Sequence, residues 1–402
     1  MRLKSNEPFW LVKNGIMNSY PSLQKNISTD IVIVGSGITG SLIAHQCLAD
    51  GYKVVIIDRR EVVNGSSSAT TSMLQYEIDT PLYELSEMIG EKAAVECYKA
   101  CARSIDMLSD IAKSIKSKAG FKKKESLYFA AYKKDVAWLE QEFEARKKAG
   151  FKVKWLSPEK IQKKYQLNNT HGGIVSNIGA SVDAYYLAHE LLDFNHKKGL
   201  QIFDKTDIKK VDATSKKVTV ITEDGLEIKA KKIIYCNGFE SVEIIKDKFV
   251  NLLSTYAIVS EQFDIKTLKN IEKTLVWNTA DPYIYLRTTA DNRILIGGED
   301  EEFVDPIKRD QLLNNKAEKL EQTFKKMFPK IPFRNDFSWA GTFGSTKDGL
   351  PYIGVHPDFP SSYFVLGFGG NGITFSVIGM EMVKAFLNKK KHYLSNHFRF
   401  RR

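Results

Sequence analysis

A glycine-rich turn near the start of the chain has the spacing of a nucleotide-binding site. The hexapeptide Gly35–Gly40 reads G-x-G-x-x-G, follows a β-branched run at Asp30–Val34 and opens a segment of helical periodicity. In this context the first glycine permits a tight turn, the second lets the backbone approach a pyrophosphate, and the third lets the helix pack close to the strand. The amides and the positive end of the helix dipole would then face the phosphates. The turn therefore predicts a site for a dinucleotide.

A carboxylate closes the next predicted strand at the distance that such a site requires. Asp58 follows the apolar run Lys53–Ile57 and lies about 20 residues beyond the glycines, where it can accept hydrogen bonds from the hydroxyls of an adenosine ribose. The order strand, turn, helix, strand and acid is typical of a β-α-β nucleotide-binding unit. These residues alone do not separate FAD from NAD, so an NAD(P)-dependent dehydrogenase is an alternative.

Two further segments favour FAD. Gly65–Leu74 is rich in small hydroxyl residues, which can donate hydrogen bonds to a diphosphate and let the backbone run under an isoalloxazine ring. Near the C-terminus, Gly367–Ile373 contains four glycines and opens an apolar helix whose N-terminal amides could face the flavin pyrimidine. Amides aimed there would stabilise the negative charge of a reduced flavin by about 1 to 3 kcal/mol. We therefore predict that the early and late glycine turns meet opposite ends of one flavin nucleotide.

Two blocks near the C-terminus carry a family resemblance. Ser345–Gly354 reads STKDGLPYIG and is similar to a late T-x-D-G-x-P-x-I-G element, and Gly367–Ile373 is similar to the closing flavin loop that follows it. Through these blocks the chain resembles, over nearly its full length, the FAD-dependent oxidoreductases of the D-amino-acid oxidase and glycine oxidase superfamily. Ser254–Glu261 and Tyr285–Gly298 make it most similar to the gamma-glutamylputrescine oxidase branch.

The resemblance implies an enzyme that oxidises the C–N bond of a small amine or amino acid. Hydride would pass to the flavin, and the imine product would hydrolyse in water. The protein would position the substrate, exclude water and tune the charge of the flavin. We expect no essential catalytic side chain beyond the flavin, no Ser-His-Asp triad and no metal site, and the electron acceptor would be dioxygen or another acceptor.

Residues in several parts of the chain are expected to contact the cofactor. They are Gly35, Ser36, Gly37, Ile38, Thr39, Gly40, Asp58, Arg59, Arg60, Ser66, Ser67, Ser68, Thr70, Thr71, Ser72, Met73, Leu74, Ile208, Asn237, Gly238, Gly344, Gly369, Gly370, Asn371, Gly372, Ile373 and Thr374.

The chain departs from the family pattern at the expected substrate end. Glycine oxidase-like members place a carboxylate-binding arginine where this chain has Phe343, and Arg287 could replace that clamp or serve as a structural ion pair. Tyr256, Tyr283 and Tyr285, together with Phe343, are candidates for an aromatic substrate wall, although the pattern of each residue alone favours the core over a site.

Two further departures concern the flavin itself. Sarcosine oxidase-like members carry a flavin-linked cysteine in the segment matching Gly341–Phe343, where this chain has none, so we expect non-covalent FAD. Leu295 lies where some members have a lysine that speeds the reaction with dioxygen, which leaves both an oxidase and a dehydrogenase possible.

Composition and charge exclude several other classes. With 43% hydrophobic and 27% charged residues the chain is globular rather than disordered. The net charge of +11 arises from 59 Lys and Arg against 48 Asp and Glu, and the lysines are scattered, which argues against nucleic-acid binding. A flavin-bearing binding or RNA-modifying protein is a second alternative, and it would require the basic residues to gather on one face.

The thiols and the apolar runs bear on location. Cys47, Cys97, Cys101 and Cys236 have no CxxC or metal-ligand spacing, and we expect all four to be reduced. No uncharged apolar run reaches the roughly 18 residues of a membrane span, and the N-terminal residues lack a signal-peptide core. These features favour a cytoplasmic protein without a membrane span, and they leave the oligomeric state open.

The elements that must position these residues alternate between two patterns. Helix-rich and strand-rich stretches recur, and a strand, glycine turn and helix return at Tyr363–Leu387. We expect an α/β fold in which a Rossmann-type FAD-binding domain is interleaved with an α+β substrate domain built on a mostly antiparallel sheet. The predicted division is an N-terminal extension at 1–27, FAD-binding parts at 28–92, 156–245 and 338–402, and substrate-domain parts at 93–155 and 246–337.

Overall fold

The predicted β-α-β unit forms at the residues that the glycine turn indicated. In the computed structural model, which describes residues 1–402, strand β3 (Ile31–Val34) leads through the turn into helix α2 (Ile38–Ala49), and strand β4 (Val54–Ile57) follows. The two strands pair in parallel, with Ile33 opposite Ile56. Their side chains are almost entirely buried, as expected for β-branched strands covered on both faces.

A six-stranded sheet is built around this unit. Its order is β11-β4-β3-β15-β22-β21, in which the first five strands are parallel and β21 pairs with β22 in the antiparallel sense. The added strands are β11 (Gln201–Phe203), β15 (Lys232–Tyr235), β21 (Tyr352–Gly354) and β22 (Ser362–Leu366). The sheet thus draws on parts of the chain that are far apart in sequence.

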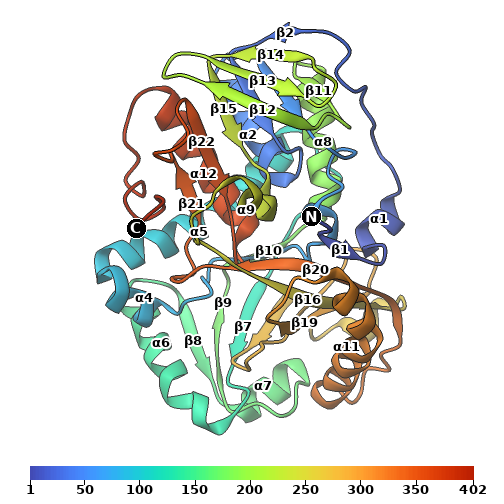
Figure 1. Ribbon diagram of the computed structural model, residues 1–402. Coiled ribbons are helices and arrows are strands. Elements are labelled where there is room, and N and C mark those ends of the chain that lie inside the picture. The colour runs from blue at the N-terminus through green and yellow to red at the C-terminus, as the bar shows by residue number, and fades with distance from the viewer.

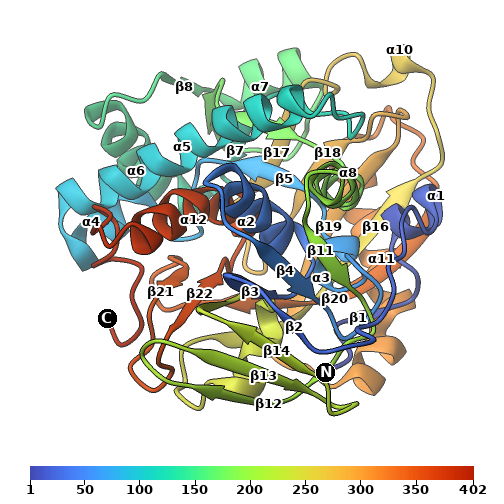
Figure 2. The ribbon, with the colours of Figure 1, turned by 90° about the horizontal axis from the view of Figure 1, so that it is seen from above.

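Each face of this sheet is covered by a different layer. Helices α2, α8 (Ala184–His196) and α12 (Gly372–Leu387) lie side by side on one face, as Figure 2 shows. A four-stranded sheet covers the other face, made of β12 (Ile208–Ala213), β13 (Val218–Thr222), β14 (Glu227–Ala230) and β2 (Ile27–Ser28). Strand alternation divides the core accordingly: Ile33 packs in the helix-side cluster and Val32 in the sheet-side cluster.

A nine-stranded sheet forms the second unit, in the lower half of Figure 1. Its order is β1 (Lys4–Ser5), β20 (Asn335–Ser345), β16 (Asn251–Ser260), β19 (Ile294–Glu301), β18 (Tyr285–Thr288), β17 (Thr274–Asn278), β7 (Glu125–Phe129), β9 (Gly173–Ser176) and β8 (Val153–Leu156). Every neighbouring pair is antiparallel except β17 and β7. Helix α11 (Pro306–Met327) packs on β16, β19 and β20 and closes a core with their apolar residues.

The remaining elements connect or flank these sheets. They are the small sheet β5 (Met73–Gln75), β10 (Gly179–Ser181) and β6 (Lys122–Lys123), the helices α1 (Phe9–Asn14), α3 (Ser66–Ala69), α4 (Leu82–Ile89), α5 (Glu91–Ser114), α6 (Val136–Lys148), α7 (Pro158–Tyr165), α9 (Ser241–Ile244) and α10 (Ile265–Leu268), and 3-10 turns at Lys133–Asp135 and Gly238–Glu240.

The expected fold class is confirmed, and sheet membership differs from the predicted division in detail. The parallel sheet and the mostly antiparallel sheet interleave along the chain. However, β9 lies in a stretch assigned to the FAD-binding part, β20 crosses the boundary at 337/338, and β1 comes from the predicted extension, yet all three join the nine-stranded sheet. Their partners are distant in sequence, so local composition does not reveal the pairing.

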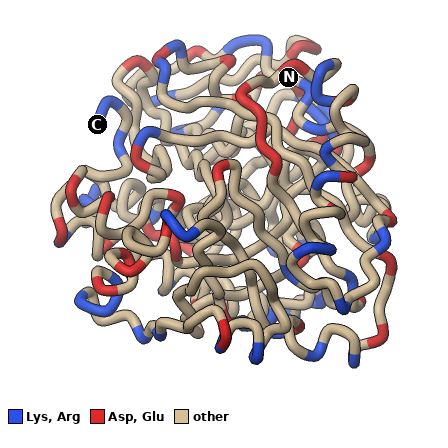
Figure 3. Tube along the Cα trace, turned by 90° about the horizontal axis from the view of Figure 1, so that it is seen from below, with Lys and Arg blue, Asp and Glu red and all other residues tan.

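Three further features concern the thiols, the helices and the surface charge. All four cysteines are free and buried. No helix has both the length and the apolar composition needed to cross a bilayer. On the face seen from below, Figure 3 shows Lys and Arg intermingled with Asp and Glu rather than gathered into one field.

Candidate cofactor and substrate site

One large cavity joins the early and the late glycine turns. It has a volume of about 1160 Å³ and is lined by residues of both, including Gly37 and Gly370. Typical small-ligand pockets span about 300–1,000 Å³, so this cavity is large enough for an extended ligand such as a dinucleotide. From the β12 strand at one end, it runs to β16, β18 and β20 of the nine-stranded sheet at the other.

The early turn leaves the start of α2 open to this cavity. A Cβ atom on Gly37 would lie 2.8 Å from Ser67 Oγ, and one on Gly40 would lie 1.8 Å from the carbonyl oxygen of Gly35. The Ile38 amide donates to Ser67 Oγ at 3.0 Å, whereas the amides of Gly37 and Thr39 have no acceptor in the chain. Unpaired amides at a helix N-terminus are a site for a phosphate.

Asp58 lies beside this turn, at the end of β4. Its carboxylate accepts hydrogen bonds from the amide and hydroxyl of Ser36, at 2.8 and 2.6 Å, and from the Arg60 amide at 3.0 Å. Burial raises the pKa of the Asp58 carboxyl above its ordinary value, although these donated bonds act in the opposite direction. The Arg60 guanidinium is held by Glu240, with Nη2 2.5 Å from Oε1, and Arg59 pairs with the same carboxylate. Asp58 and both arginines line the cavity.

The late turn is fixed by hydrogen bonds to β20 and to the segment that follows β5. The Gly369 amide donates to the carbonyl of Gly344 at 2.8 Å, and the Gly370 amide donates to the Asp79 carboxylate at 3.0 Å. Helix α12 begins at Gly372 and lies beside α2, where Ser376 Oγ and Thr39 Oγ1 are 2.7 Å apart. The two helices that open at the glycine turns therefore present their N-termini to the same cavity.

Most of the predicted cofactor residues line the cavity. Those that do are Gly35, Gly37, Ile38, Thr39, Asp58, Arg59, Arg60, Ser66, Ser67, Thr70, Thr71, Ser72, Met73, Ile208, Asn237, Gly238, Gly369, Gly370, Gly372 and Ile373. Those that lie behind its wall are Ser36, Gly40, Ser68, Leu74, Gly344, Asn371 and Thr374. Two of the second group hold cavity residues in place: Ser36 orients Asp58, and Asn371 Nδ2 donates to the carbonyl of Gln75, which also lines the cavity, at 3.0 Å.

Tyr285 and Phe343 lie at the end of the cavity that is formed by the nine-stranded sheet. Both line the cavity, as does Tyr283, whose ring centroid is 5.5 Å from that of Tyr285. The Tyr285 ring covers Gly297, where an added Cβ would lie 2.4 Å from the phenol oxygen. Glycine at that position lets the ring lie against the sheet.

Tyr256 borders the cavity but turns its ring away from it. The ring packs in the core beneath α11, 5.7 Å from Lys316 Nζ, and only 1% of the residue is exposed. Its neighbour Ala257 packs in the opposite cluster, because successive residues of a strand face opposite sides. The geometry therefore does not support a substrate contact by the Tyr256 side chain.

Arg287 is not brought to this cavity. It shares a sheet face with Tyr285 but lies two residues further along β18, and its Nε donates to the Thr71 carbonyl at 2.7 Å while Nη2 donates to the Val182 carbonyl at 3.0 Å. It lines a separate, smaller cavity. The expected carboxylate clamp is absent from this arrangement because the guanidinium is directed behind the 70–72 loop.

Three polar residues at the substrate end had no sequence signal. Thr255 lines the cavity, Asp300 lies near the end of β19, and Asp79 accepts a hydrogen bond from the late turn. Burial raises the pKa of the Asp300 carboxyl to about 6, and Oδ1 of this residue has no hydrogen-bond partner. A bulge in the pairing of β16 with β19 sets this orientation, and such a bulge could not be placed from the sequence.

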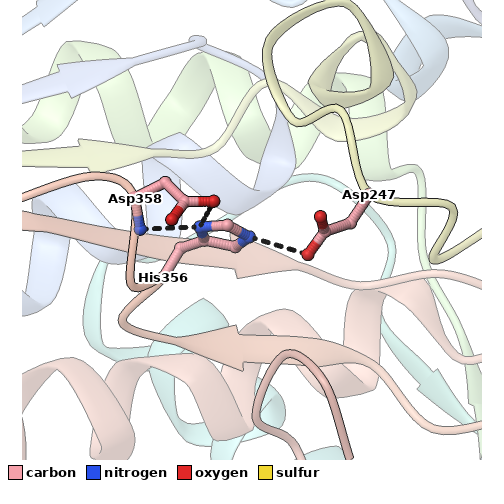
Figure 4. Close-up of side chains that lie close together, drawn as sticks. All are labelled: Asp247, His356 and Asp358. Atoms are coloured by element: carbon pink, nitrogen blue, oxygen red, sulfur yellow. Dashed lines mark hydrogen bonds and ion pairs between the residues drawn. The ribbon is translucent and has the colours of Figure 1, made fainter.

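A separate cluster of His356, Asp247 and Asp358 is shown in Figure 4. His356 Nε2 lies 3.4 Å from Asp247, and Nδ1 lies 3.8 Å from Asp358. Arg401 bridges the two carboxylates, at 2.7 Å to Asp247 and 2.8 Å to Asp358. Because that guanidinium already supplies positive charge, the arrangement is that of an ion-pair network near the C-terminal residues.

A sequence model of the family described as FAD dependent oxidoreductase matches residues 30–385. The chain belongs to this family. Its cofactor is accordingly FAD, and the cavity fits that group: it has unpaired amides at the α2 N-terminus, a buried carboxylate at the end of β4 and a second helix N-terminus at the far turn. A site for NAD(P) alone would not account for the late turn.

Known proteins similar to this FAD-dependent oxidoreductase include amine and amino-acid enzymes. The putative Rieske 2Fe-2S iron-sulfur protein YhfW of Bacillus subtilis is 24% identical over 96% of this chain and 74% of its own length. Gamma-glutamylputrescine oxidoreductase of Escherichia coli is 22% identical over 92% of this chain and 85% of its own length. The crystal structure of glycine oxidase from Geobacillus kaustophilus shares the fold, with a TM-score of 0.77 and 19% identity over 93% of this chain and 99% of that one.

Proposed function

We propose that this enzyme oxidises the C–N bond of a small amine. The observation that carries the proposal is the single cavity that connects both glycine turns with an aromatic wall on the nine-stranded sheet. When bound, FAD would accept a hydride from the carbon next to the nitrogen after the ammonium has lost a proton to solvent, which leaves an iminium ion. The imine that leaves the site then hydrolyses in water.

Tyr283, Tyr285 and Phe343 position the substrate in this proposal. Aromatic faces attract cationic nitrogen and exclude water from the reacting carbon. Burial raises the pKa of both tyrosines above the ordinary value, so the phenols remain neutral at physiological pH. They therefore act as polarisable walls and hydrogen-bonding groups rather than as bases.

The charges at the substrate end favour an amine over an amino acid. None of the cavity-lining residues from β16, β18 and β20 is basic. Phe343 replaces the expected arginine, and Arg287 is directed elsewhere. The nearby acids are Asp300, with its unpaired Oδ1, and Asp79. A substrate carboxylate would meet repulsion there, whereas an ammonium group would be attracted.

The flavin is proposed to bind without a covalent link. Gly341, Thr342 and Phe343 line the cavity where some relatives of the family carry a flavin-linked cysteine. Cys236 also borders the cavity, but it lies at the end of β15 beside Gly35, and burial raises the pKa of its thiol far above the ordinary value. Acid denaturation should release the flavin into the supernatant.

The substrate is tested by anaerobic reduction of the purified holoenzyme. Loss of the oxidised flavin absorbance is followed while simple amines, diamines, N-methyl amino acids, D-amino acids and gamma-glutamyl amines are added in turn. We expect cationic amines and diamines to bleach the flavin faster than zwitterionic amino acids do. Bleaching by amino acids alone would contradict the proposed amine preference, and bleaching by none of these classes would contradict C–N oxidation.

Admission of air to the reduced enzyme then tests the electron acceptor. Leu295 is fully buried and pairs across the sheet with Arg287, so no side-chain cation is present at that position to favour reaction with dioxygen. We propose a dehydrogenase that passes electrons to an acceptor other than dioxygen. Slow reoxidation in air is the expected result, and reoxidation within the mixing time would identify an oxidase.

A further inference from the structure

A second cavity of about 180 Å³ is separate from the flavin cavity and belongs to no site described above. It is enclosed by α1, the segment 118–124, the turn between β10 and α8, Glu272, and the turn between β18 and β19. Its lining includes five basic residues, Lys13, Lys118, Lys122, Lys124 and Arg287, against two acidic residues, Asp183 and Glu272.

Two of these cations are almost completely enclosed. Lys124 is 6% exposed and Arg287 is 2% exposed. Lys124 Nζ donates to the Glu272 carbonyl at 2.5 Å and to Thr288 Oγ1 at 2.8 Å, both neutral acceptors. Arg287 donates only to carbonyl oxygens, and the Trp10 ring lies 5.1 Å from its Cζ. An ammonium has three donors and a guanidinium has five, so both groups retain N–H bonds that are free for a ligand.

The neighbouring acids do not neutralise this pair. Asp183 caps α8 through the Tyr186 amide at 2.9 Å and accepts from Asn14 at 2.8 Å. Neither Asp183 nor Glu272 comes within ion-pair distance of Lys124 or Arg287. Lys13 is paired with Asp291, at 3.4 Å. Burial of charges without a counterion is strongly unfavourable, so a bound anion would stabilise the arrangement.

We propose that the second cavity binds a small oxyanion, held by the free donors of Lys124 and Arg287. Lys118 and Lys122 are exposed at its rim and supply a positive approach to it. The volume admits a single carboxylate or phosphate-type group rather than a nucleotide. Because Arg287 also holds the Thr71 carbonyl of the cofactor loop, the bound anion would brace that loop from behind.

Anion binding at this site should depend on pH, because it depends on the charge of Lys124. Burial and the positive charges of Arg287 and Lys122 together lower the pKa of this ammonium to about 7, against a smaller opposing effect of Glu272. Lys13, Lys118, Asp183 and Asp291 are the other charged groups around the cavity. Anion binding requires the protonated ammonium, so affinity should fall as the pH rises through and above about 7, by up to about tenfold per pH unit.

Calorimetric titration of the holoenzyme with sodium sulfate, and separately with sodium acetate, tests this site. Neither probe titrates between about pH 6 and pH 9, and sodium chloride keeps the ionic strength constant. We expect one saturable site for at least one probe: sulfate binding alone indicates a phosphate-type ligand, and acetate binding alone indicates a carboxylate. Absence of saturable binding by both probes at about pH 6 would overturn the proposal.

Three variants show whether Lys124 carries the binding. Lys124→Gln should weaken the anion by at least about tenfold, since it removes a charged donor. Lys124→Arg should bind with little change between about pH 6 and pH 9, because a guanidinium stays protonated over that range. Lys123→Gln is the matched control: its side chain is exposed, pairs with Asp106 and should leave binding unchanged.

Two outcomes of the variant series would overturn the assignment. One is a pH dependence in Lys124→Arg equal to that of the unmodified enzyme. The other is equal weakening by Lys123→Gln and Lys124→Gln. If Lys124→Gln does not fold, the pH dependence of the unmodified enzyme and of Lys124→Arg still decides the question, and neither measurement depends on the proposed amine oxidation.

Discussion

A side chain on Gly37 would project beside Ser67 into the cavity at the start of α2, and this gives a direct test of the cofactor site. In Gly37→Val the Cβ would approach Ser67 Oγ to 2.8 Å, and the added methyl groups would fill the space that a pyrophosphate needs. We expect the variant to fold but to purify without flavin. The ratio of flavin to protein absorbance measures this. Ala49→Val, at the exposed C-terminal end of α2, is the control and should keep its full flavin content.

The ionisation of the Asp300 carboxyl group should make the activity depend on pH. Because its pKa is raised to about 6, the carboxylate becomes ionised as the pH rises through about 6 and can then attract a cationic amine. For the unmodified enzyme, kcat/KM for amines should rise up to about pH 6 and then level off. In Asp300→Asn that inflection should vanish, and kcat/KM at neutral pH should fall about 10- to 100-fold, mainly through KM.

The sign of the stability effect at Asp300 is opposite to that of the activity effect. A carboxyl with a raised pKa holds its proton more tightly in the folded state, so stability falls as the pH rises from about 4 to about 6. Asp300→Asn should remove this decline. Glu302→Gln, at an exposed position nearby, is the control for both measurements, and an unchanged pH profile in Asp300→Asn would show that another group titrates.

At the scale of elements, a buried ion cluster joins α6 to the segment that follows β5. This segment also carries Asp79, which accepts a hydrogen bond from the late glycine turn. Arg146 pairs with Glu142 on its own helix at 2.6 Å and with Glu77, after β5, at 3.4 Å; all three side chains are buried. Arg146→Leu would leave two buried carboxylates unpaired and should lower the free energy of unfolding by about 3–5 kcal/mol. Denaturant unfolding measures this. Lys147→Leu, at the exposed neighbour, should change it by less than about 0.5 kcal/mol.

The elements that were predictable from the sequence are those fixed by local patterns. The run Ile31–Val34, the glycine turn and the helix to Ala49 follow from β-branching and helical periodicity, which act over a few residues. It was harder to predict from the sequence which face of a strand would point to the cavity. Tyr256 and Tyr285 are both strand tyrosines, yet only the second directs its ring to the cavity, because cross-strand pairing and a bulge decide which face is buried.

At the scale of the whole molecule, the sequence could predict that two units interleave but not where each strand would join. β9 and β20 pair with strands far away along the chain, and such partners leave no local trace. Asp79 and Arg287 could not be predicted for the same reason, because each acts on a segment that is distant in sequence. Asp79 accepts a hydrogen bond from the late turn, and Arg287 donates one to the cofactor loop. Residues of the glycine-rich motifs, whose backbone amides face the cavity, were therefore easier to predict than residues that act through tertiary contacts.

Because both units line the flavin cavity, the cofactor should stabilise the whole molecule. Residues of α2, β12, β18 and β20 all border the cavity, so FAD can bind in full only to the assembled fold. A ligand specific to the folded state adds about 2.7 kcal/mol at a free concentration 100 times its Kd. We expect the Tm of the apoprotein to rise progressively as FAD is titrated, in a single transition. In Gly37→Val the rise should be lost. Two separate transitions, of which FAD moved only one, would show that the six-stranded and nine-stranded units unfold independently and that the cavity is not shared between them.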